Sequence, residues 1–308
     1  MKLTVPSVLN QRFSIIGLLV LVFLVPLAGL VPAAAQTPTS GGSMVKKHAQ
    51  FGSKLIDPRD VDVWLPPGYE TDTHKRYPVL YMHDGQNIFD PKTSYGGVDW
   101  GVDETLDRLI REKKIRPAIV VGIWNSPKRY AEYMPQKAAK NPDTAHLKNI
   151  PINATGPIVS DNYLKFLVTE LKPFIDASYR TLTDRKNTFI MGSSMGGLIS
   201  AYAISEYPNV FGGAGCVSTH WPAGEGAMIE YLKNHLPDPR THKIYFDYGT
   251  ATLDSTYEPF QLKMDEVMKQ RGYKAGKNWI TRKFEGAEHS EKSWRERVDI
   301  PLVFLIGK

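Results

Sequence analysis

The sequence has one cysteine, Cys216, among its 308 residues, so the chain cannot form an internal disulfide bond. Stability must therefore come from a hydrophobic core, which a chain of this length can supply. Cys216 lies in the apolar run 211–217, where a buried small side chain is favoured over a thiol nucleophile. Hydrophobic residues make up 42% of the sequence and charged residues 23%, a composition that indicates a globular protein and excludes a disordered chain.

The sequence also lacks any block of lysines and arginines with interleaved aromatic residues. Its net charge is +6, but the basic residues are scattered among acidic ones. Nucleic acid is therefore not expected as a partner. The sequence shows no internal repeat and no Ser/Gly-rich linker after its N-terminal region, which indicates a single domain.

One long hydrophobic stretch lies near the N-terminus, from Phe13 to Leu30, after the basic residues Lys2 and Arg12. The small residues Ala33 to Ala35 follow it, which favours a removable secretory signal over a retained membrane anchor. We therefore expect a secreted or periplasmic protein without a stable membrane anchor. The expected division is a signal peptide over residues 1–35, a flexible neck over 36–46 and a folded domain over 47–308.

From about residue 60, short β-branched or aromatic runs alternate with amphipathic stretches, the pattern of a parallel sheet covered by helices. The runs are almost continuously apolar, as expected for strands that are buried on both faces. The polar segment 125–157 is too long for an ordinary connection, so we expect a functional loop or a small cap there. Strands are expected at 61–65, 77–82, 118–124, 188–191, 213–217, 243–248 and 279–284, and helices at 103–113, 162–179, 195–206, 225–234, 257–271 and from about 290.

Residues 192–196 read Gly-Ser-Ser-Met-Gly, between an expected strand and an expected helix. A nucleophile elbow needs small residues two positions before and two positions after the reactive serine, because its strained turn leaves no room for larger ones. Ser194 has Gly192 and Gly196 at these positions, whereas Ser193 would place methionines there. Ser194 is therefore the expected nucleophile. The alternative is a tight turn in which one of the serines caps the helix.

A reactive serine on such an elbow takes its orienting acid and its base from later in the chain. His289 lies in a polar loop directly after the last expected strand, which makes it the preferred base. His220 also follows a strand end and is the competing candidate, or it could line the pocket. Asp254, in the polar loop after strand 243–248, is the preferred acid, and Glu258 at a helix N-terminus is the alternative.

Acyl transfer also needs two backbone N–H groups that point at the developing oxyanion. The N–H of Met195 follows the serine at a helix N-terminus, where free donors and a positive dipole coincide. Gln86 is expected to supply the second N–H, because Gly85 lets the loop approach a ligand closely. The pair His83-Asp84 has no partner at metal-ligand spacing, so we expect neither a metal nor an organic cofactor.

With these residues the chain resembles the putative esterase family of α/β-hydrolases, which includes esterase D, feruloyl esterases, enterochelin and salmochelin esterases, and mycolyltransferases. The resemblance implies an α/β-hydrolase fold, with a mostly parallel central sheet and helices on both faces. It also implies a serine carboxylic ester hydrolase, which the N-terminal segment predicts to be exported. The matching segments are YMHDGQNIFD (81–90), WGVDE (100–104), RYAEYMP (129–135), GSSMGG (192–197), YGT (248–250) and GAEHSEKSW (286–294).

The resemblance leaves the substrate open among small-molecule and carbohydrate esters. The spacing of Arg129 and Glu132 is similar to that of the siderophore esterases, whose substrate is a catecholate trilactone; alternatively these two residues form a salt bridge that holds the long loop. An acyltransferase of the mycolyltransferase kind would share the triad, and a ligand-binding protein on the same fold is the non-enzyme alternative. The candidate substrate-binding residues are Asp84, Trp100, Trp124, Arg129, Glu132, His220 and Trp221.

Overall fold

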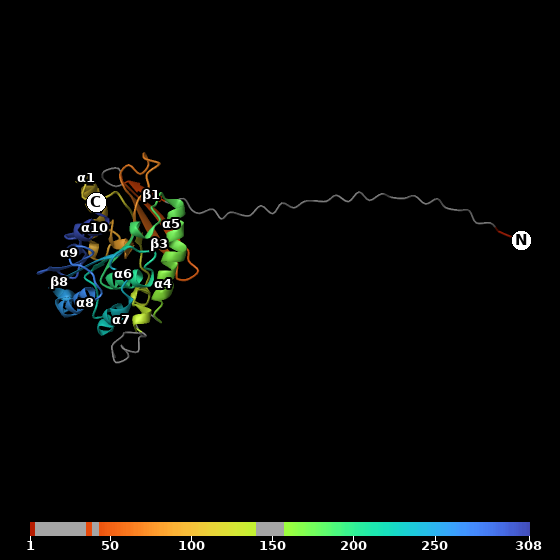
Figure 1. The fold of residues 1–308 in the computed structure, drawn as a ribbon. Coiled ribbons are helices and arrows are strands. Elements are labelled where there is room, and N and C mark those ends of the chain that lie inside the picture. Colours follow the sequence, from red (N-terminus) through yellow and green to blue (C-terminus); the bar gives the residue numbers. More distant parts are fainter. Residues whose placement is uncertain (4–34, 39–42, 140–156) are drawn as a thin grey trace. The chain divides into compact units, whose positions relative to one another are not determined.

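A nine-stranded sheet lies at the centre of the unit from Ala34 to Lys308 (Figure 1). The computed structural model describes residues 1–3, 35–38, 43–139 and 157–308. The strand order is β1-β2-β3-β5-β4-β6-β7-β8-β9. The strands are β1 (Ala35–Pro38), β2 (Met44–Phe51), β3 (Arg59–Leu65), β4 (Val79–His83), β5 (Ile119–Ile123), β6 (Thr188–Ser193), β7 (Gly213–Val217), β8 (Lys243–Gly249) and β9 (Trp279–Phe284).

The strands from β5 to β9 in this order pair in parallel, as the sequence predicts. Alternate residues of a strand point to opposite faces of the sheet. In β4, Val79 and Tyr81 accordingly join one buried cluster, whereas Leu80 and Met82 join another. Both faces of the parallel strands are therefore covered, which explains their continuous apolar runs.

Helices cover both faces of the sheet. One buried cluster includes residues of α2 to α8, and the other includes residues of α1, α9 and α10. The helices are α1 (Val102–Arg111), α2 (Arg129–Tyr133), α3 (Gln136–Ala139), α4 (Ser160–Phe166), α5 (Lys172–Ser178), α6 (Met195–Glu206), α7 (Ala227–His235), α8 (Glu258–Gln270), α9 (Glu291–Arg295) and α10 (Asp299–Ile306). Short helical turns are η1 (Gly85–Asn87), η2 (Tyr95–Gly97), η4 (Leu167–Leu171), η5 (Arg185–Asn187), η6 (Ala223–Gly226) and η7 (Thr252–Thr256).

The first two strands include residues of the expected neck over 36–46. β1 pairs with β2, and β2 pairs with β3, both antiparallel. Residues 36–38 and 44–46 thus take part in backbone pairing, whereas residues 39–42 lie outside the described residues, and the neck stays a prediction. The sequence of β2, MVKKHAQF, gives little sign of this because its residues are half-buried or exposed, and its strand conformation depends on the ladder to β3.

The long segment 125–157 is partly helical, since α2 and α3 lie within it. Its remaining part from 140 to 156 lies outside the described residues. Most of the expected signal peptide also lies outside them, so its cleavage stays a prediction. Within the residues that the structure describes, no helix combines the length and the apolar character needed to cross a membrane.

Candidate active site

Ser194 lies at the turn between β6 and α6 with φ 58° and ψ −123°. A non-glycine residue with positive φ is strained and persists only where its surroundings hold it. Here the Ser194 N–H donates to the carbonyl of Val217 at 2.9 Å, and the Ser194 carbonyl accepts from the N–H of His220 at 3.1 Å. Backbone bonds from the loop after β7 therefore hold the turn on both sides.

The glycines around Ser194 occupy positions that have no room for a side chain. A Cβ on Gly192 would lie 2.8 Å from the carbonyl carbon of Gly196, and a Cβ on Gly196 would lie 3.2 Å from Oδ2 of Asp84. The neighbouring Ser193 is instead the last residue of β6, paired with Val217 of β7. The steric argument that selects Ser194 over Ser193 agrees with this geometry.

A cleft of about 410 Å³ opens at Ser194. Most of the residues that line it have polar side chains, and most follow the carboxyl ends of strands, where ligands bind in open α/β sheets. The lining residues are Asp84, Gln86, Asn87, Tyr95, Asn125, Arg129, Ser193, Ser194, His289, Glu291 and Trp294.

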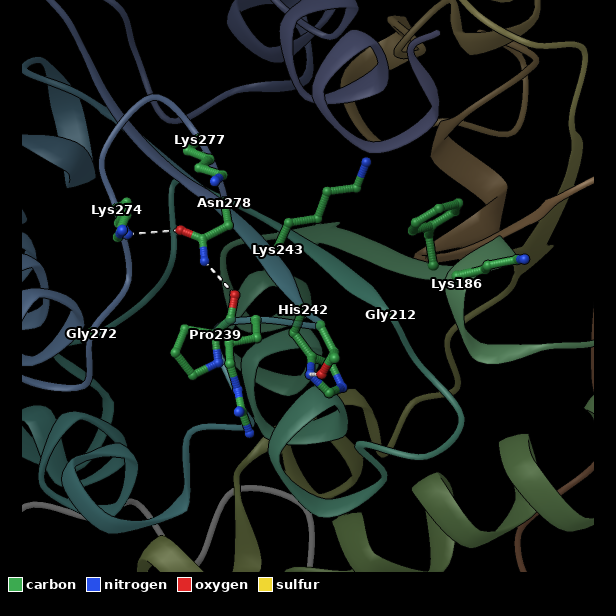
Figure 2. Close-up of a pocket in the computed structure, with 12 residues that line it drawn as sticks. Lys186, Gly212, Pro239, His242, Lys243, Gly272, Lys274, Lys277 and Asn278 are labelled. Carbon is green, nitrogen blue, oxygen red and sulfur yellow. Dashed lines mark hydrogen bonds between the residues drawn. The ribbon is translucent and has the colours of Figure 1, made fainter.

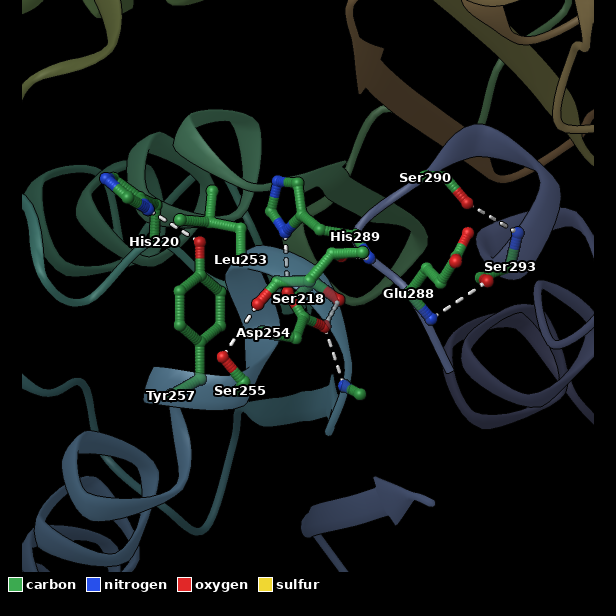
Figure 3. A network of polar contacts seen from close by, with 12 residues as sticks. Ser218, His220, Leu253, Asp254, Ser255, Tyr257, Glu288, His289, Ser290 and Ser293 are labelled. Atoms are coloured by element: carbon green, nitrogen blue, oxygen red, sulfur yellow. Dashed lines mark hydrogen bonds and ion pairs between the residues drawn. The ribbon is translucent and has the colours of Figure 1, made fainter. Parts of the chain in front are cut away.

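His289 reaches the cleft from the loop between β9 and α9. Its Nδ1 lies 2.5 Å from Oδ1 of Asp254 (Figure 3). The backbone N–H of His289 donates to Oγ1 of Thr252 at 2.8 Å, which fixes the loop. Because Nδ1 is engaged with a carboxylate, Nε2 is the nitrogen available for proton transfer. The structure thus brings together the expected base and the expected acid.

Asp254 lies in η7 and is 1% exposed. Its second oxygen, Oδ2, accepts from the N–H of Gly249 and from Oγ of Ser218, both at 2.6 Å. Burial raises the pKa of Asp254, but the bonds from His289, Ser218 and Gly249 outweigh burial and hold the pKa below its ordinary value. The carboxylate is therefore kept ionised and in one orientation.

A buried polar network lies behind Asp254, and the sequence gives no sign of it. Oγ of Ser218 accepts from Nη2 of Arg297 at 2.8 Å and from the indole N–H of Trp294 at 3.0 Å. Arg297 also pairs with the fully buried Asp247 at 3.2 Å, where burial raises the pKa of that carboxyl. A buried cation is thus connected to Asp254 through one hydroxyl.

The alternative acid and the alternative base lie elsewhere. Glu258 accepts from the hydroxyl of Tyr248 at 3.2 Å and pairs with Lys283 at 3.1 Å, so its carboxylate serves the surface of α8. Nδ1 of His220 lies 2.6 Å from the hydroxyl of Tyr257, which also hydrogen-bonds the Ser194 side chain. Burial, together with the nearby His289, lowers the pKa of His220 to about 4. Among the described residues, the ring of His220 thus pairs with a tyrosine hydroxyl and not with a carboxylate.

The two expected oxyanion donors, Met195 and Gln86, come from the start of α6 and from η1. Met195 is the first residue of α6, so its N–H has no partner within the helix. Gln86 lies in η1 and lines the cleft, and its side-chain oxygen accepts from the N–H of Asn125 at 3.2 Å. Their role as donors stays a prediction.

Arg129 and Glu132 do not pair with each other, which corrects the expected salt bridge. Arg129 binds Asp84 with Nε at 2.7 Å and Nη2 at 2.8 Å, and it faces the cleft. Burial raises the pKa of Asp84, but the Arg129 charge and the Asn125 amide outweigh it and lower the pKa. Glu132 is 1% exposed and pairs with Arg59 at 2.7 Å, so it holds α2 and is not available to a substrate.

Three tryptophans named as candidate substrate-binding residues also lie away from the cleft lining. Trp100 is buried and packs on Trp294 with ring centroids 5.4 Å apart. The indole of Trp124 donates to Asp62 at 2.7 Å, and that of Trp221 donates to Gln261 at 2.8 Å in the core. The sequence places these residues near strand ends, but it does not show which side their rings take.

One group of carboxylates in the described part of the chain could offer three oxygens to a cation. Asp99, Asp103 and Glu104 have oxygens within 4.8 Å of one another. Arg295 already pairs with Asp99 at 2.7 Å and with Glu104 at 3.5 Å, and none of the three carboxylates lines the cleft. This group therefore adds nothing to the chemistry at Ser194.

Comparisons with known proteins place the chain in a family. The model of the family described as "Putative esterase" matches residues 52–300. "Uncharacterized protein YbbA" of Bacillus subtilis is 25% identical over 259 residues, covering 81% of this chain and 93% of its own. An endo-1,4-beta-xylanase/feruloyl esterase of Xylanibacter ruminicola is 26% identical over 251 residues, covering 76% of this chain and 27% of its own.

Solved structures share the fold at lower identity. A ferulic acid esterase superposes with a TM-score of 0.62 at 20% identity, covering 86% of this chain and 98% of its own. The enterobactin esterase of Shigella flexneri superposes with a TM-score of 0.60 at 19% identity, covering 89% of this chain and 61% of its own. The expected α/β-hydrolase fold is confirmed.

Proposed function

The chain belongs to the putative esterase family and is a carboxylic ester hydrolase, and we propose that it is an exported enzyme with Ser194 as its nucleophile. In this proposal His289 is the general base and Asp254 the orienting acid. The observation that carries it is the 2.5 Å contact between Nδ1 of His289 and Oδ1 of Asp254, at a cleft that Ser194 and His289 both line.

The proposed reaction uses these groups in two steps. Oγ of Ser194 attacks the ester carbonyl while Nε2 of His289 removes its proton and passes it to the leaving alcohol. Water then attacks the acyl-enzyme with the same base, which releases the acid and restores the serine. Asp254 stabilises the imidazolium in both steps, and the N–H groups of Met195 and Gln86 stabilise the oxyanion.

The cleft favours esters with a polar or aromatic acid over those with a long alkyl chain. Six of its eleven lining residues carry an amide, carboxylate or guanidinium group, and its two large rings are Tyr95 and Trp294. Two proteins similar to this chain are named for feruloyl and enterobactin esters. The kcat/KM values for nitrophenyl acetate, a feruloyl ester, an acetylated sugar and a catecholate trilactone test this preference. A higher kcat/KM for nitrophenyl palmitate than for all of these would contradict it.

The adjacent serines give the test of the nucleophile. Ser194→Ala should lower kcat on p-nitrophenyl acetate by about 10⁴-fold or more, because no other group can form the acyl-enzyme. Ser193→Ala should keep most of the activity. A fluorophosphonate probe should label the wild type and Ser193→Ala but not Ser194→Ala, and the opposite pattern would contradict the assignment. An unlabelled wild-type protein that binds an ester without cleaving it would indicate the non-enzyme alternative.

Two further measurements address export and the acceptor. Mass spectrometry of the protein exported by its own host should give a chain that begins at Gln36, and recovery of the uncleaved chain in the membrane fraction would contradict export. Product analysis with an added sugar alcohol should give the free acid as the main product. Transfer of the acyl group to the sugar as the main product would indicate an acyltransferase.

A further inference from the structure

A second cavity lies at the opposite edge of the sheet from Ser194. Because β6, β7, β8 and β9 are parallel, their amino ends meet at one edge, whereas Ser194 follows a carboxyl end. The cavity has a volume of about 500 Å³ (Figure 2). It is lined by residues that precede these strands or lie at their first positions: Lys186, Phe189, Gly212, Pro239, Arg240, Thr241, His242, Lys243, Gly272, Lys274, Lys277 and Asn278.

The charge of this lining is entirely basic. It contains four lysines and one arginine but no aspartate or glutamate. Arg240 is neutralised by Asp238 at 2.6 Å. Within the described part of the chain, Lys186, Lys274 and Lys277 form no ion pair with a carboxylate. These three lysines of the cavity are thus left without a counter-charge from the described part of the chain.

Lys243 lines the cavity, and burial of its ammonium charge is unfavourable. Its ammonium donates to the carbonyl of Phe304 at 2.9 Å and lies 5.3 Å from the ring centroid of Phe189. Burial, with a further contribution from the charge of Arg116, lowers the pKa of Lys243 to about 8. A negative charge in the cavity would reduce this cost.

The walls of the cavity are tied together by the chain itself. The side chain of Asn278 donates to the carbonyl of Pro239 and accepts from the N–H of Lys274 at 2.7 Å (Figure 2). His242 is buried, with Nε2 2.7 Å from the carbonyl of Pro208. The loops before β8 and β9 therefore keep their relative positions before any ligand binds, which lowers the entropic cost of binding.

We propose that this cavity binds a small anion that carries two or more phosphate groups. Its volume falls within the range of about 300–1,000 Å³ that is usual for small-molecule sites. Lysine ammonium groups are donors to phosphate oxygens, and a concave, single-sign lining concentrates anions. The cations come from three separate loops, so one phosphate would leave most of them without a counter-charge. This proposal is independent of the chemistry at Ser194.

Calorimetric titration of the whole protein with inorganic tripolyphosphate, pyrophosphate and orthophosphate tests the site. At 50 mM salt, tripolyphosphate should bind at least about tenfold more tightly than orthophosphate, and its affinity should fall at 200 mM salt because each ion pair releases counterions. The double variant Lys274→Gln/Lys277→Gln should weaken tripolyphosphate binding at least about tenfold.

The control removes the same charge from another surface. Lys263→Gln/Lys269→Gln on α8 should leave the affinity for tripolyphosphate nearly unchanged, and the thermal unfolding and esterase activity of both double variants should match the wild type. Equal weakening by the two double variants, or no binding to the wild type, would overturn the proposal.

A vesicle experiment distinguishes a lipid source of the phosphates from a soluble one. If lipid headgroups fill the cavity, the wild-type protein should sediment with vesicles of phosphatidylcholine that contain a phosphatidylinositol bisphosphate, and tripolyphosphate should release the protein from them. Tripolyphosphate binding without sedimentation would assign a soluble ligand. Sedimentation that the Lys274→Gln/Lys277→Gln variant retains in full would contradict the cavity as the site.

Discussion

Among the described residues, charged side chains are paired at the carboxyl edge of the parallel sheet and largely unpaired at its amino edge. At the carboxyl edge every buried carboxylate near Ser194 has a partner: His289 for Asp254 at 2.5 Å and Arg129 for Asp84 at 2.7 Å. At the amino edge, by contrast, lysines face a cavity without any carboxylate. The first arrangement fixes reacting groups before a substrate arrives, as catalysis requires. The second leaves charge to be neutralised from outside, as binding requires.

The largest difference between the edges should appear in activity. Asp254→Asn should lower kcat by about 10⁴-fold, because an amide disfavours the His289 tautomer that accepts the serine proton and cannot stabilise the imidazolium. Asp238→Asn, the same change at the amino edge, should alter kcat less than twofold. Both are measured on p-nitrophenyl acetate. A loss below tenfold in Asp254→Asn would remove Asp254 from the proposed triad.

Stability should show the next largest difference. Arg297→Met leaves Asp247 buried without its cation, so we expect the free energy of unfolding to fall by about 3–5 kcal/mol. Arg240→Met breaks an exposed pair with Asp238, and its free energy of unfolding should stay within error of the wild type. Urea denaturation measures both. Equal small losses would show that the Arg297 pair contributes no more than a surface one.

The parts of the site that the sequence predicts are those set by local rules. The position between an expected strand and an expected helix, with glycines two residues before and after it, selects Ser194. The order of the chain after the nucleophile then selects Asp254 and His289. These rules depend on residues close together in sequence, or on the order in which parallel strands end.

The parts that the sequence does not predict depend on contacts between distant segments. Ser218 and Arg297 are 79 positions apart, and neither lies in a recognisable motif. Arg129 and Glu132 are three positions apart and look like a helical pair, yet each finds a buried partner elsewhere. The same limit applies to β2, whose strand conformation comes from pairing with β3 and not from its own apolar pattern.

Removal of the Ser218 hydroxyl should have a smaller effect than removal of the Asp254 or the Arg297 charge. Ser218→Ala deletes one donor to Asp254, so kcat/KM should fall about tenfold, corresponding to one hydrogen bond to a charged group. The pKa of Asp254 should rise, since one of the bonds that lowers it is lost. The ratio of kcat/KM at pH 5 to that at pH 8 should therefore fall.

The matched change at the amino edge is Thr241→Val, which also removes one hydroxyl. It should alter neither kcat/KM nor its pH dependence, because Thr241 bonds only to the neighbouring Asp238 carbonyl and the His242 ring. A Ser218→Ala variant whose loss is the same at both pH values would show that Ser218 supports packing and does not position the carboxylate.

The smallest effect is expected at Lys243, where a substitution should stabilise the protein, whereas the changes above lower activity or stability. The pKa of Lys243 is about 8 in the folded chain and 10.5 ordinarily, so the folded chain releases this proton first. Between these pH values the unfolded chain holds the proton, and stability rises with pH; below pH 8 the full cost of the buried charge remains. Lys243→Met should therefore raise the free energy of unfolding at pH 7 by about 1 kcal/mol, after loss of the bond to Phe304. In urea denaturation at pH 10, Lys243→Met should show no gain in the free energy of unfolding. The exposed Lys277→Met should show no gain at pH 7 or at pH 10. A gain in Lys243→Met that persists at pH 10 would assign the effect to packing of the methionine and not to the removed charge.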